Sequence, residues 1–219
     1  MILVNFKIYR QTWGEGGVRL AKICQKVGVE SGVEVIPIVS AFELYRIKQE
    51  VEGKMFIQGG ERWIEGAHSG AISMAQAWEN GASGVILNHS ERRLPPGEIR
   101  NILPLVPASM TRAVCLGTEG QMEKWGKRLK LDWLIYEPKE LIGNREKSVA
   151  SEKPEIIARM VKATGAPLLV GAGVHSRADV EISLKLGARG VLVSSDVVLA
   201  ADPEKELREL AEGFLNPPP

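Results

Sequence analysis

Short runs of β-branched and other apolar residues alternate with longer amphipathic stretches along the whole chain. Eight such runs occur, and most have no polar face, which is typical of parallel strands that are buried on both sides. The pattern therefore predicts eight buried parallel strands, at residues 2–8, 33–38, 55–58, 84–87, 111–116, 133–136, 167–170 and 190–193.

The stretches between these runs carry a helical repeat. Apolar residues recur at the spacing of one helix face in two clear sets: Leu20, Ile23, Cys24 and Val27, and Leu207, Leu210, Ala211 and Phe214. Helix starts are marked by Pro154, by Ser176 and by Asp202 followed by Pro203. Helices thus separate the predicted strands.

Eight strand–helix units in 219 residues leave about 27 residues for each unit, enough for a strand, a loop and a helix. An open doubly wound sheet usually has fewer strands and a Gly-x-Gly-x-x-Gly turn after the first strand, and no such turn follows residues 2–8. The pattern therefore predicts a closed (β/α)8 barrel, a single domain over residues 1–219. In that fold, functional side chains lie at the C-terminal ends of the strands.

Composition and charge narrow the function. The formal net charge is only +1, which argues against nucleic acid or an anionic membrane as a partner. No apolar run approaches the roughly 20 residues of a membrane span, and no signal segment opens the chain, so we expect a cytoplasmic protein. Cys24 and Cys115 have the apolar neighbours of buried thiols, and His68, His89 and His175 are too widely separated in sequence to predict a metal site.

Polar residues lie on the first predicted strand and directly after two others. Asn5 and Lys7 lie two residues apart, so we expect their side chains on the same side of the first strand. A polar cluster, residues 88–93, follows the fourth strand, and Glu137 follows the sixth. Taken singly, each has a structural explanation: Lys7 could reach a surface carboxylate, the histidine of the cluster could be a hydrogen-bonded structural residue, and Glu137 could cap the next helix.

The last two strands end in small residues. Gly171, Ala172 and Gly173 follow the seventh, and Ser194 and Ser195 follow the eighth. Small residues let a ligand approach backbone N–H groups, and helices begin soon after both segments, so the pair is a candidate phosphate cradle. The glycines alone are weak support, because glycine also serves tight turns.

A cation, an imidazole, a carboxylate and an anion cradle would all meet at one rim of the barrel. The segments that carry them are Asn5-Phe6-Lys7, Asn88-His89-Ser90-Glu91-Arg92-Arg93, Tyr136-Glu137-Pro138, Leu141-Ile142-Gly143 and Gly171-Ala172-Gly173. Through these segments the chain resembles the triosephosphate isomerase family, particularly its short archaeal form, over nearly its whole length. The resemblance implies interconversion of dihydroxyacetone phosphate and D-glyceraldehyde 3-phosphate through an enediolate, in glycolysis and gluconeogenesis, without a cofactor or metal.

The resemblance also implies roles for the residues at the rim. Glu137 would be the catalytic base, and Asn5, Lys7 and His89 would stabilise the negative charge that develops on oxygen. His89 is expected to act as a neutral imidazole. The pair that follows it, Ser90-Glu91, would support these groups from behind, the glutamate by pairing with the lysine.

A lid is expected over this site, because the enediolate phosphate can eliminate its phosphate group if water enters. Residues 138–140 would form its first hinge and residues 141–144 its tip, and Gly143 would donate its backbone N–H to the phosphate. Two hydrophobic residues in the tip are consistent with closure over a ligand.

Four residues at three places depart from the family pattern. Asn144-Arg145 replaces the usual Thr-Gly of the lid, His175 stands where Ser or Thr is common, and Asp196 replaces a customary Gly. Two like unit charges about 4 Å apart repel by about 4 kcal/mol at an effective dielectric constant near 20. We therefore expect Asp196 to turn away from the phosphate and cap a local helical turn, with His175 able to compensate at mildly acidic pH.

The long loop after the third strand, residues 59–70, carries two hydrophobic side chains near its middle. In the family this loop inserts into a neighbouring subunit, so Trp63 and Ile64 are candidate anchors and His68 is expected to support the loop. The resemblance implies a homo-oligomer, at least a homodimer, with a tetramer as the other arrangement found among archaeal relatives.

Two other functions fit a barrel with a phosphate site. A phosphoribosyl isomerase would use paired acidic groups on different strands, which this sequence does not show. A catalytically impaired barrel could serve as a phosphate-ligand binding protein, and Asp196, His175 and Arg145 are the residues in its favour. Retention of Asn5, Lys7, His89 and Glu137 favours the isomerase.

Overall fold

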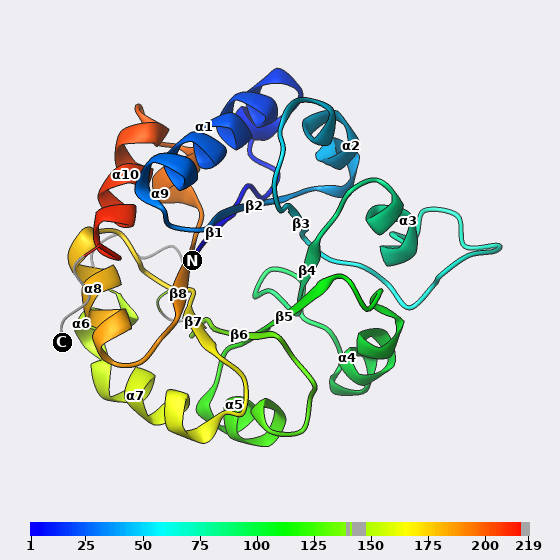
Figure 1. Cartoon of the computed structure of the whole chain (residues 1–219). Helices are drawn as coiled ribbons and strands as arrows, with labels where there is room; N and C mark the ends of the chain where they lie inside the picture. Colours follow the sequence, from blue (N-terminus) through cyan, green and yellow to red (C-terminus); the bar gives the residue numbers. More distant parts are fainter. Residues whose placement is uncertain (139–140, 142–147, 216–219) are drawn as a thin grey trace.

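Eight parallel strands form one closed ring, and helices surround it (Figure 1). In the computed structural model, residues 1–138, 141 and 148–215 are described. The strands are β1 (Ile2–Asn5), β2 (Val35–Val39), β3 (Phe56–Ile57), β4 (Gly84–Leu87), β5 (Thr111–Leu116), β6 (Trp133–Tyr136), β7 (Leu168–Val170) and β8 (Gly190–Val193). The predicted (β/α)8 barrel is confirmed.

The helices fill the connections between strands. They are α1 (Glu15–Ser31), α2 (Ala41–Glu50), α3 (Met74–Glu79), α4 (Pro96–Ile102), α5 (Glu119–Gly126), α6 (Val149–Glu152), α7 (Pro154–Ala163), α8 (Arg177–Lys185), α9 (Ser195–Val198) and α10 (Pro203–Glu212), with short 3-10 turns at Arg10–Thr12 and Leu103–Leu105. The three predicted helix starts are confirmed. Pro154 is the first residue of α7, Ser176 caps α8, and the Asp202 side chain accepts from the Lys205 N–H at the start of α10.

The ring closes between the first strand and the last. Each strand pairs in parallel with its successor, and β1 pairs with β8 so that Ile2 lies opposite Val191 and Val4 opposite Val193. Because the strands run the same way around the ring, their C-terminal ends share one rim.

Two layers of apolar side chains hold the barrel together. The interior is filled by alternate strand residues: Leu3, Ile36, Ile38, Phe56, Ile86, Ala113, Cys115, Ile135, Leu169 and Leu192. The opposite faces of the strands pack against the buried faces of the helices in a larger cluster, which includes the predicted stripe residues Leu20, Cys24 and Val27. Cys24 and Cys115 are free, buried thiols, as expected.

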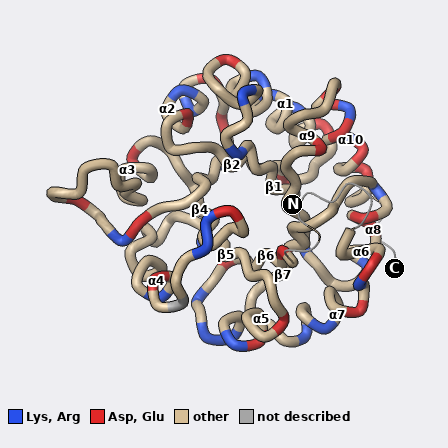
Figure 2. The backbone as a smooth tube through the Cα atoms, turned by 180° about the vertical axis from the view of Figure 1, so that it is seen from behind, with Lys and Arg blue, Asp and Glu red and all other residues tan. Residues whose placement is uncertain are grey.

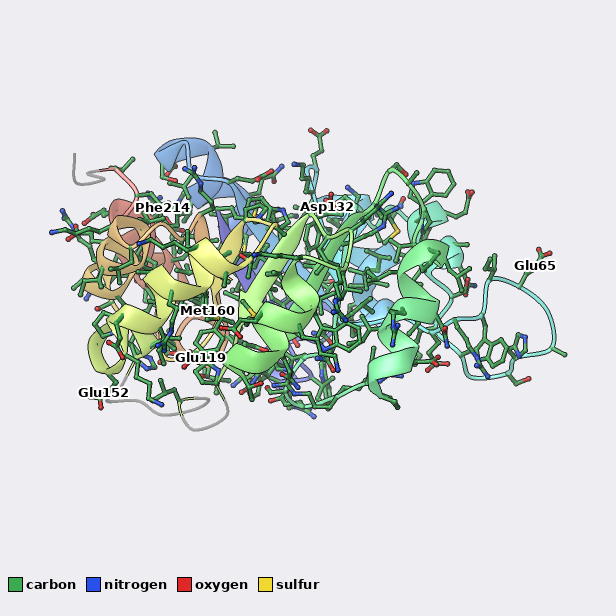
Figure 3. The ribbon with its side chains drawn as sticks, turned by 90° about the horizontal axis from the view of Figure 1, so that it is seen from below. Glu65, Glu119, Asp132, Glu152, Met160 and Phe214 are labelled. Carbon is green, nitrogen blue, oxygen red and sulfur yellow. The ribbon has the colours of Figure 1, made fainter. Side chains whose placement is uncertain are left out.

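Charged residues of both signs are spread around the outer helices (Figure 2). Among the described helices, none combines the length and the apolar character needed to cross a membrane. One loop departs from the compact outline: the segment after β3 projects sideways beyond the helical ring, with Glu65 near its tip (Figure 3).

Candidate active site

Lys7 reaches the mouth of the barrel from a turn. β1 ends at Asn5, and Lys7 has a φ of 47°, in the left-handed region that residues other than glycine rarely adopt. Asn5 holds this turn, because its Oδ1 accepts a hydrogen bond from the Lys7 N–H at 3.1 Å. The prediction that Asn5 and Lys7 share one side of a strand over residues 2–8 is therefore wrong. Asn5 instead shapes the turn that presents Lys7.

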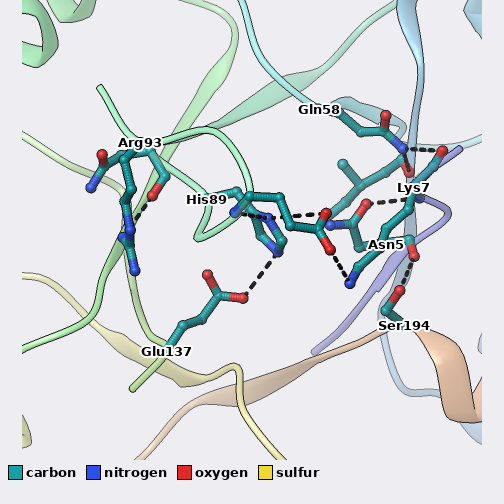
Figure 4. A network of polar contacts seen from close by, with 10 residues as sticks. Asn5, Lys7, Gln58, His89, Arg93, Glu137 and Ser194 are labelled. Carbon is teal, nitrogen blue, oxygen red and sulfur yellow. Dashed lines mark hydrogen bonds and ion pairs between the residues drawn. The ribbon is translucent and has the colours of Figure 1, made fainter. Parts of the chain in front are cut away.

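Gln58, just after β3, is a residue of this site that the sequence pattern did not single out. Its Nε2 donates to the Lys7 carbonyl at 2.8 Å and lies 3.4 Å from the Ile38 carbonyl at the end of β2 (Figure 4). The amide therefore ties the Lys7 turn to the barrel rim. The sequence did carry one signal for Gln58, because it is a polar residue at the end of an otherwise apolar run. We predicted it only as the last residue of a strand.

His89 is positioned by a second left-handed residue, Asn88, whose φ is 61°. Asparagine tolerates this conformation better than most residues. Both ends of its side chain are engaged: Nδ2 donates to the Cys115 carbonyl at 2.7 Å, and Oδ1 accepts from the Leu94 N–H at 2.9 Å. The turn that follows β4 is thereby fixed against β5, and His89 is buried above the barrel interior.

Hydrogen bonding assigns the proton on the His89 ring. Its Nδ1 accepts from the Glu91 N–H at 3.3 Å, so the remaining proton of a neutral imidazole sits on Nε2. Nε2 lies 3.2 Å from Glu137 Oε1. The Glu91 carboxylate also approaches the ring, at 3.6 Å, but its other oxygen is 2.7 Å from Lys7 Nζ, and this ion pair offsets its charge. The geometry fits the expected neutral imidazole with its N–H facing the site.

Glu137 follows β6 and is only 2% exposed. Oε1 faces His89, whereas Oε2 is shielded from solvent and has no nitrogen or oxygen donor among the residues that the structure describes. A carboxylate with a poorly solvated oxygen keeps lone pairs available for a proton. Its backbone is fixed to the rim, since the Glu137 N–H donates to the Leu116 carbonyl at 2.9 Å.

The Cys115 thiol lies inside the barrel beside Glu137. Burial raises its pKa well above the ordinary value, and the negative charge of Glu137 and a hydrogen bond with it add to this rise. The thiol therefore stays protonated at neutral pH and adds no second negative charge next to the carboxylate.

Lys7, His89 and Glu137 open onto one cavity, as the sequence hypothesis required. The same cavity is lined by the predicted cradle residues, Gly171, Ala172, Gly173, Ser194 and Ser195. Asn5 and Glu91 line an adjoining cavity, which shares Lys7 and His89 with the first. Residues from the ends of β1, β4, β6, β7 and β8 thus converge on one point at the rim.

The cradle offers backbone donors. Gly173 has a φ of 66°, which glycine adopts freely. Within the described part of the chain, no hydrogen bond engages the N–H groups of Gly173 and Ser195. The Ser194 hydroxyl is committed elsewhere, since it donates to the Asn5 carbonyl at 2.8 Å. Ser194 therefore joins β8 to β1, and only its backbone is left for a ligand.

Two further expectations meet different outcomes. Ser90 Oγ is shielded from solvent and has no hydrogen-bond partner among the described residues, so no contact supports its expected supporting role. Of the predicted lid, Pro138 and Leu141 are described, and Leu141 is buried with its N–H bonded to the Pro138 carbonyl at 3.1 Å. Gly143, Asn144 and Arg145 lie outside the described residues.

The prediction that Asp196 caps a turn and points away is wrong. Ser194 is the N-cap of α9, and Asp196 sits in its first turn with its side chain on the cavity. Its Oδ2 lies 3.1 Å from His175 Nδ1, at ion-pair distance from the ring.

Gly171→Ala is expected to lower kcat at least tenfold with a smaller change in KM. A Cβ at this position would lie 2.7 Å from Glu137 Cγ and from Ile135 Cγ2, so it would push the carboxylate out of place. Misplacing a reacting group by about 1 Å can cost about a hundredfold in rate. Steady-state kinetics would test this.

The matched control is Gly120→Ala on α5, where an added Cβ meets nothing within 4 Å. We expect this variant to keep the parent kinetics. Equal kinetics for both variants would contradict a role for Gly171 in making room for Glu137.

Known proteins resemble this chain along nearly its full length. The family profile described as triosephosphate isomerase matches residues 1–212. The chain is 36% identical over 220 residues to the triosephosphate isomerase of Saccharolobus solfataricus, covering 99% of this chain and 96% of that protein. It is 35% identical over 214 residues to the enzyme of that name from Methanosarcina acetivorans, covering 95% and 96%. The corresponding protein of Methanothermus fervidus is 32% identical over 215 residues, covering 96% of each chain.

The match extends from β1 through α10 and so includes every strand end described above. With this coverage, the chain belongs to the triosephosphate isomerase family.

Proposed function

We propose that this chain interconverts dihydroxyacetone phosphate and D-glyceraldehyde 3-phosphate, with Glu137, His89 and Lys7 as its catalytic residues. The assignment of this reaction rests on membership of the triosephosphate isomerase family. The observation that supports the residue roles is the convergence of these three side chains on one cavity, with His89 Nε2 only 3.2 Å from Glu137 Oε1. A cytoplasmic location, as expected of an enzyme of glycolysis, belongs to the same proposal.

Glu137 moves the proton. Its carboxylate removes a proton from the carbon next to the substrate carbonyl, and the electron pair of that C–H bond forms the enediolate. Returning the proton to the neighbouring carbon, together with transfer of the hydroxyl proton from one enediolate oxygen to the other, completes the isomerisation, so one carboxylate serves both carbon protonation steps without a net change. The buried position keeps bulk water from exchanging or protonating the intermediate.

His89 and Lys7 stabilise the oxygen on which negative charge develops. The neutral His89 ring offers its Nε2–H, and the Lys7 ammonium supplies positive charge. Glu91 orients Lys7 through the 2.7 Å ion pair, while Asn5 and Gln58 fix the backbone turn from which it projects. These donors are held in place before substrate binds, so little reorganisation accompanies the reaction.

The phosphate would be held by backbone N–H groups of the cradle, residues 171–173 and 194–195, with Gly143 of the lid as a further donor. The N–H groups of Gly173 and Ser195, which make no hydrogen bond to any described residue, support this role. Fixing the phosphate keeps the leaving group away from the geometry in which elimination occurs.

A coupled assay with D-glyceraldehyde 3-phosphate tests the activity. Conversion at rates typical of enzymes, lost in Glu137→Gln, is the expected result. Phosphate binding without turnover would instead favour the catalytically impaired binding protein, for which the carboxylate of Asp196 in the cavity is the supporting observation.

We also propose that the chain forms a homodimer, at least, through the loop after β3. This loop projects from the barrel and presents Ile64, which is 51% exposed. His68 stacks on Trp63 with ring centroids 3.9 Å apart, which gives the loop its own support, and Arg92 pairs with Glu61 at its base at 2.8 Å.

The surface that would receive this loop lies beside the active site. The adjoining cavity is flanked by Ile8, 76% exposed, and Phe42, 96% exposed, and it shares Lys7 with the catalytic cavity. Large exposed hydrophobic side chains around a cavity are typical of a surface that a partner covers. Insertion of the loop from a second copy would bury them and close that side of the site.

Ile64→Glu is expected to convert the dimer into a monomer, because a charge would then be buried at the centre of the contact. Sedimentation velocity at micromolar concentration would measure this, with Val29→Glu as the control, since Val29 is 79% exposed on α1 outside the loop and the cavity. A parent chain that sediments as a monomer would contradict the proposed dimer.

A further inference from the structure

Two side chains of the cavity, His175 and Asp196, are not used by the mechanism above. His175 follows β7 and Asp196 follows β8, and their side chains meet with Nδ1 and Oδ2 3.1 Å apart. Both line the cavity that holds Glu137 and the cradle. An imidazole and a carboxylate at this distance attract each other strongly when the ring is protonated.

Both residues are held by fixed backbone. The N–H groups of His175 and Ser176 each donate to Asp179 Oδ2 at 3.1 Å, and Ser176 caps α8. Asp196 lies in the first turn of α9, where the N–H groups of the next two residues bond to the Ser194 carbonyl. The contact between the two side chains therefore joins two anchored loops across the cradle.

The charges around the cavity would repel a phosphate dianion. Among the described residues that line it, Lys7 carries a positive charge, Glu137 and Asp196 carry negative charges, and His89 is neutral, so one negative charge is in excess. Lys7 is also shared with Glu91 of the adjoining cavity. A positive charge on His175 would remove this excess at the point where the phosphate binds.

We propose that His175 and Asp196 form a charge-compensated pair that sets the phosphate affinity of this cavity. Among the described residues neither ring nitrogen of His175 has a hydrogen-bond partner: Nδ1 lies at ion-pair distance from Asp196, whose charge the protonated ring cancels, and Nε2 donates to a phosphate oxygen. His175 is thus a specificity-determining residue for the anionic end of the substrate. This inference deepens the proposed function and rests on it for the identity of the ligand.

The pair makes anion binding depend on pH. An imidazole changes charge between about pH 5 and pH 8, so binding is expected to be tight on the acidic side of this range and weaker on the alkaline side. The other titratable groups that face the cavity are Lys7 and Tyr9 after β1, His89 after β4 and Glu137 after β6. They are identical in all the variants below, so their contribution can be subtracted.

Sulfate is the probe, because it remains a dianion throughout this pH range and substrate phosphate does not. Calorimetric titration of sulfate at about pH 6 and about pH 8 would compare four chains: the parent, His175→Gln, Asp196→Asn and the double variant. The parent is expected to bind roughly tenfold more weakly at the higher pH.

The variants separate the two partners. His175→Gln should lose roughly tenfold in affinity at the lower pH and much of its pH dependence, because Asp196 is left without a counter-charge. Asp196→Asn should bind more tightly than the parent at the higher pH. The double variant should bind sulfate more tightly than His175→Gln, because removing the carboxylate of Asp196 leaves no negative charge for the imidazole to cancel, and the two effects should not be additive. Its recovered affinity would also show that His175→Gln does not simply unfold the chain.

Either of two results would overturn the proposed pair. One is that His175→Gln binds sulfate as tightly as the parent at both pH values, and the other is that the effects of the two substitutions on sulfate affinity are strictly additive in the double variant. Turnover of D-glyceraldehyde 3-phosphate is measured separately. If the sulfate affinities follow the expected pattern but the parent shows no turnover, the proposed activity is refuted and the His175–Asp196 pair stands. If turnover is normal but the sulfate affinities of the parent and His175→Gln are equal, the pair is refuted and the activity stands.

Discussion

Glu137→Gln is expected to lower kcat by about a thousandfold or more and to change KM little. Glutamine keeps the shape of the side chain but cannot take a proton from carbon. General acid–base catalysis contributes about a hundredfold to ten-thousandfold, and here one group performs both proton transfers, so the loss should fall in the upper part of that range. In the proposed site, Lys7 and the cradle bind the substrate, and the substitution leaves both intact.

Thermal unfolding distinguishes loss of the base from loss of the fold. Glu137 is 2% exposed, and its Oε2 has no nitrogen or oxygen donor among the described residues. Burying a charge in this way costs folding free energy, so the neutral amide should raise Tm or leave it unchanged. Glu119→Gln is the control, because Glu119 forms a surface pair with Arg159 at 2.6 Å and should affect neither quantity. Parent-like kcat in Glu137→Gln would refute the proposed base.

Lys7→Ala is expected to lower kcat/KM by about a thousandfold, with kcat lowered and KM raised. The ammonium attracts the anionic substrate before the reaction and the developing oxyanion during it, so its removal weakens both states. It also leaves the Glu91 carboxylate without its partner beside the His89 ring, at 3.6 Å from Nδ1. Steady-state kinetics with D-glyceraldehyde 3-phosphate would show both effects.

The control for Lys7 is a lysine with the same ion-pair distance outside the site. Lys54 lies 2.7 Å from Glu34, but its side chain is 58% exposed, against 17% for Lys7. Exposed pairs contribute about 1 kcal/mol or less, so Lys54→Ala should keep kcat/KM within about twofold of the parent. Near-parent kcat/KM in Lys7→Ala would remove this residue from the proposed mechanism.

The barrel could be predicted because its signals are local. Strands buried on both faces produce continuous apolar runs, and four predicted ranges, 84–87, 111–116, 133–136 and 190–193, coincide with β4, β5, β6 and β8. The first range was too long, because the apolar residues Phe6 and Ile8 lie beyond Asn5, where β1 ends. The left-handed φ of Lys7 and the hydrogen bond from its N–H to Asn5 Oδ1 mark the turn.

The meeting of the candidate catalytic residues could be predicted because polar side chains with unusual chemistry lie at strand ends. Lys7, His89 and Glu137 follow apolar runs directly, and the structure brings them to one cavity. Gln58 was missed because it acts through the backbone of Lys7, a contact made across 51 residues of sequence. No repeat or spacing along the chain marks such a partner.

The error at Asp196 has the same origin. Considered alone, a carboxylate next to a phosphate site is expected to turn away, as repulsion requires. The structure places His175 against it from a different strand end, which changes the sign of the local interaction when the ring is protonated. Hydrophobic patterns and motifs do not predict which side chains from two separate loops will contact each other.

The seam between β1 and β8 has a consequence for how the protein is made. Ile2 pairs with Val191, so almost the entire polypeptide must leave the ribosome before the first strand acquires its second neighbour. Until then one edge of β1 is exposed, and open strand edges promote association with other chains. Because contacts this distant in sequence form slowly, synthesis at low temperature or with chaperones present should increase the yield of native enzyme.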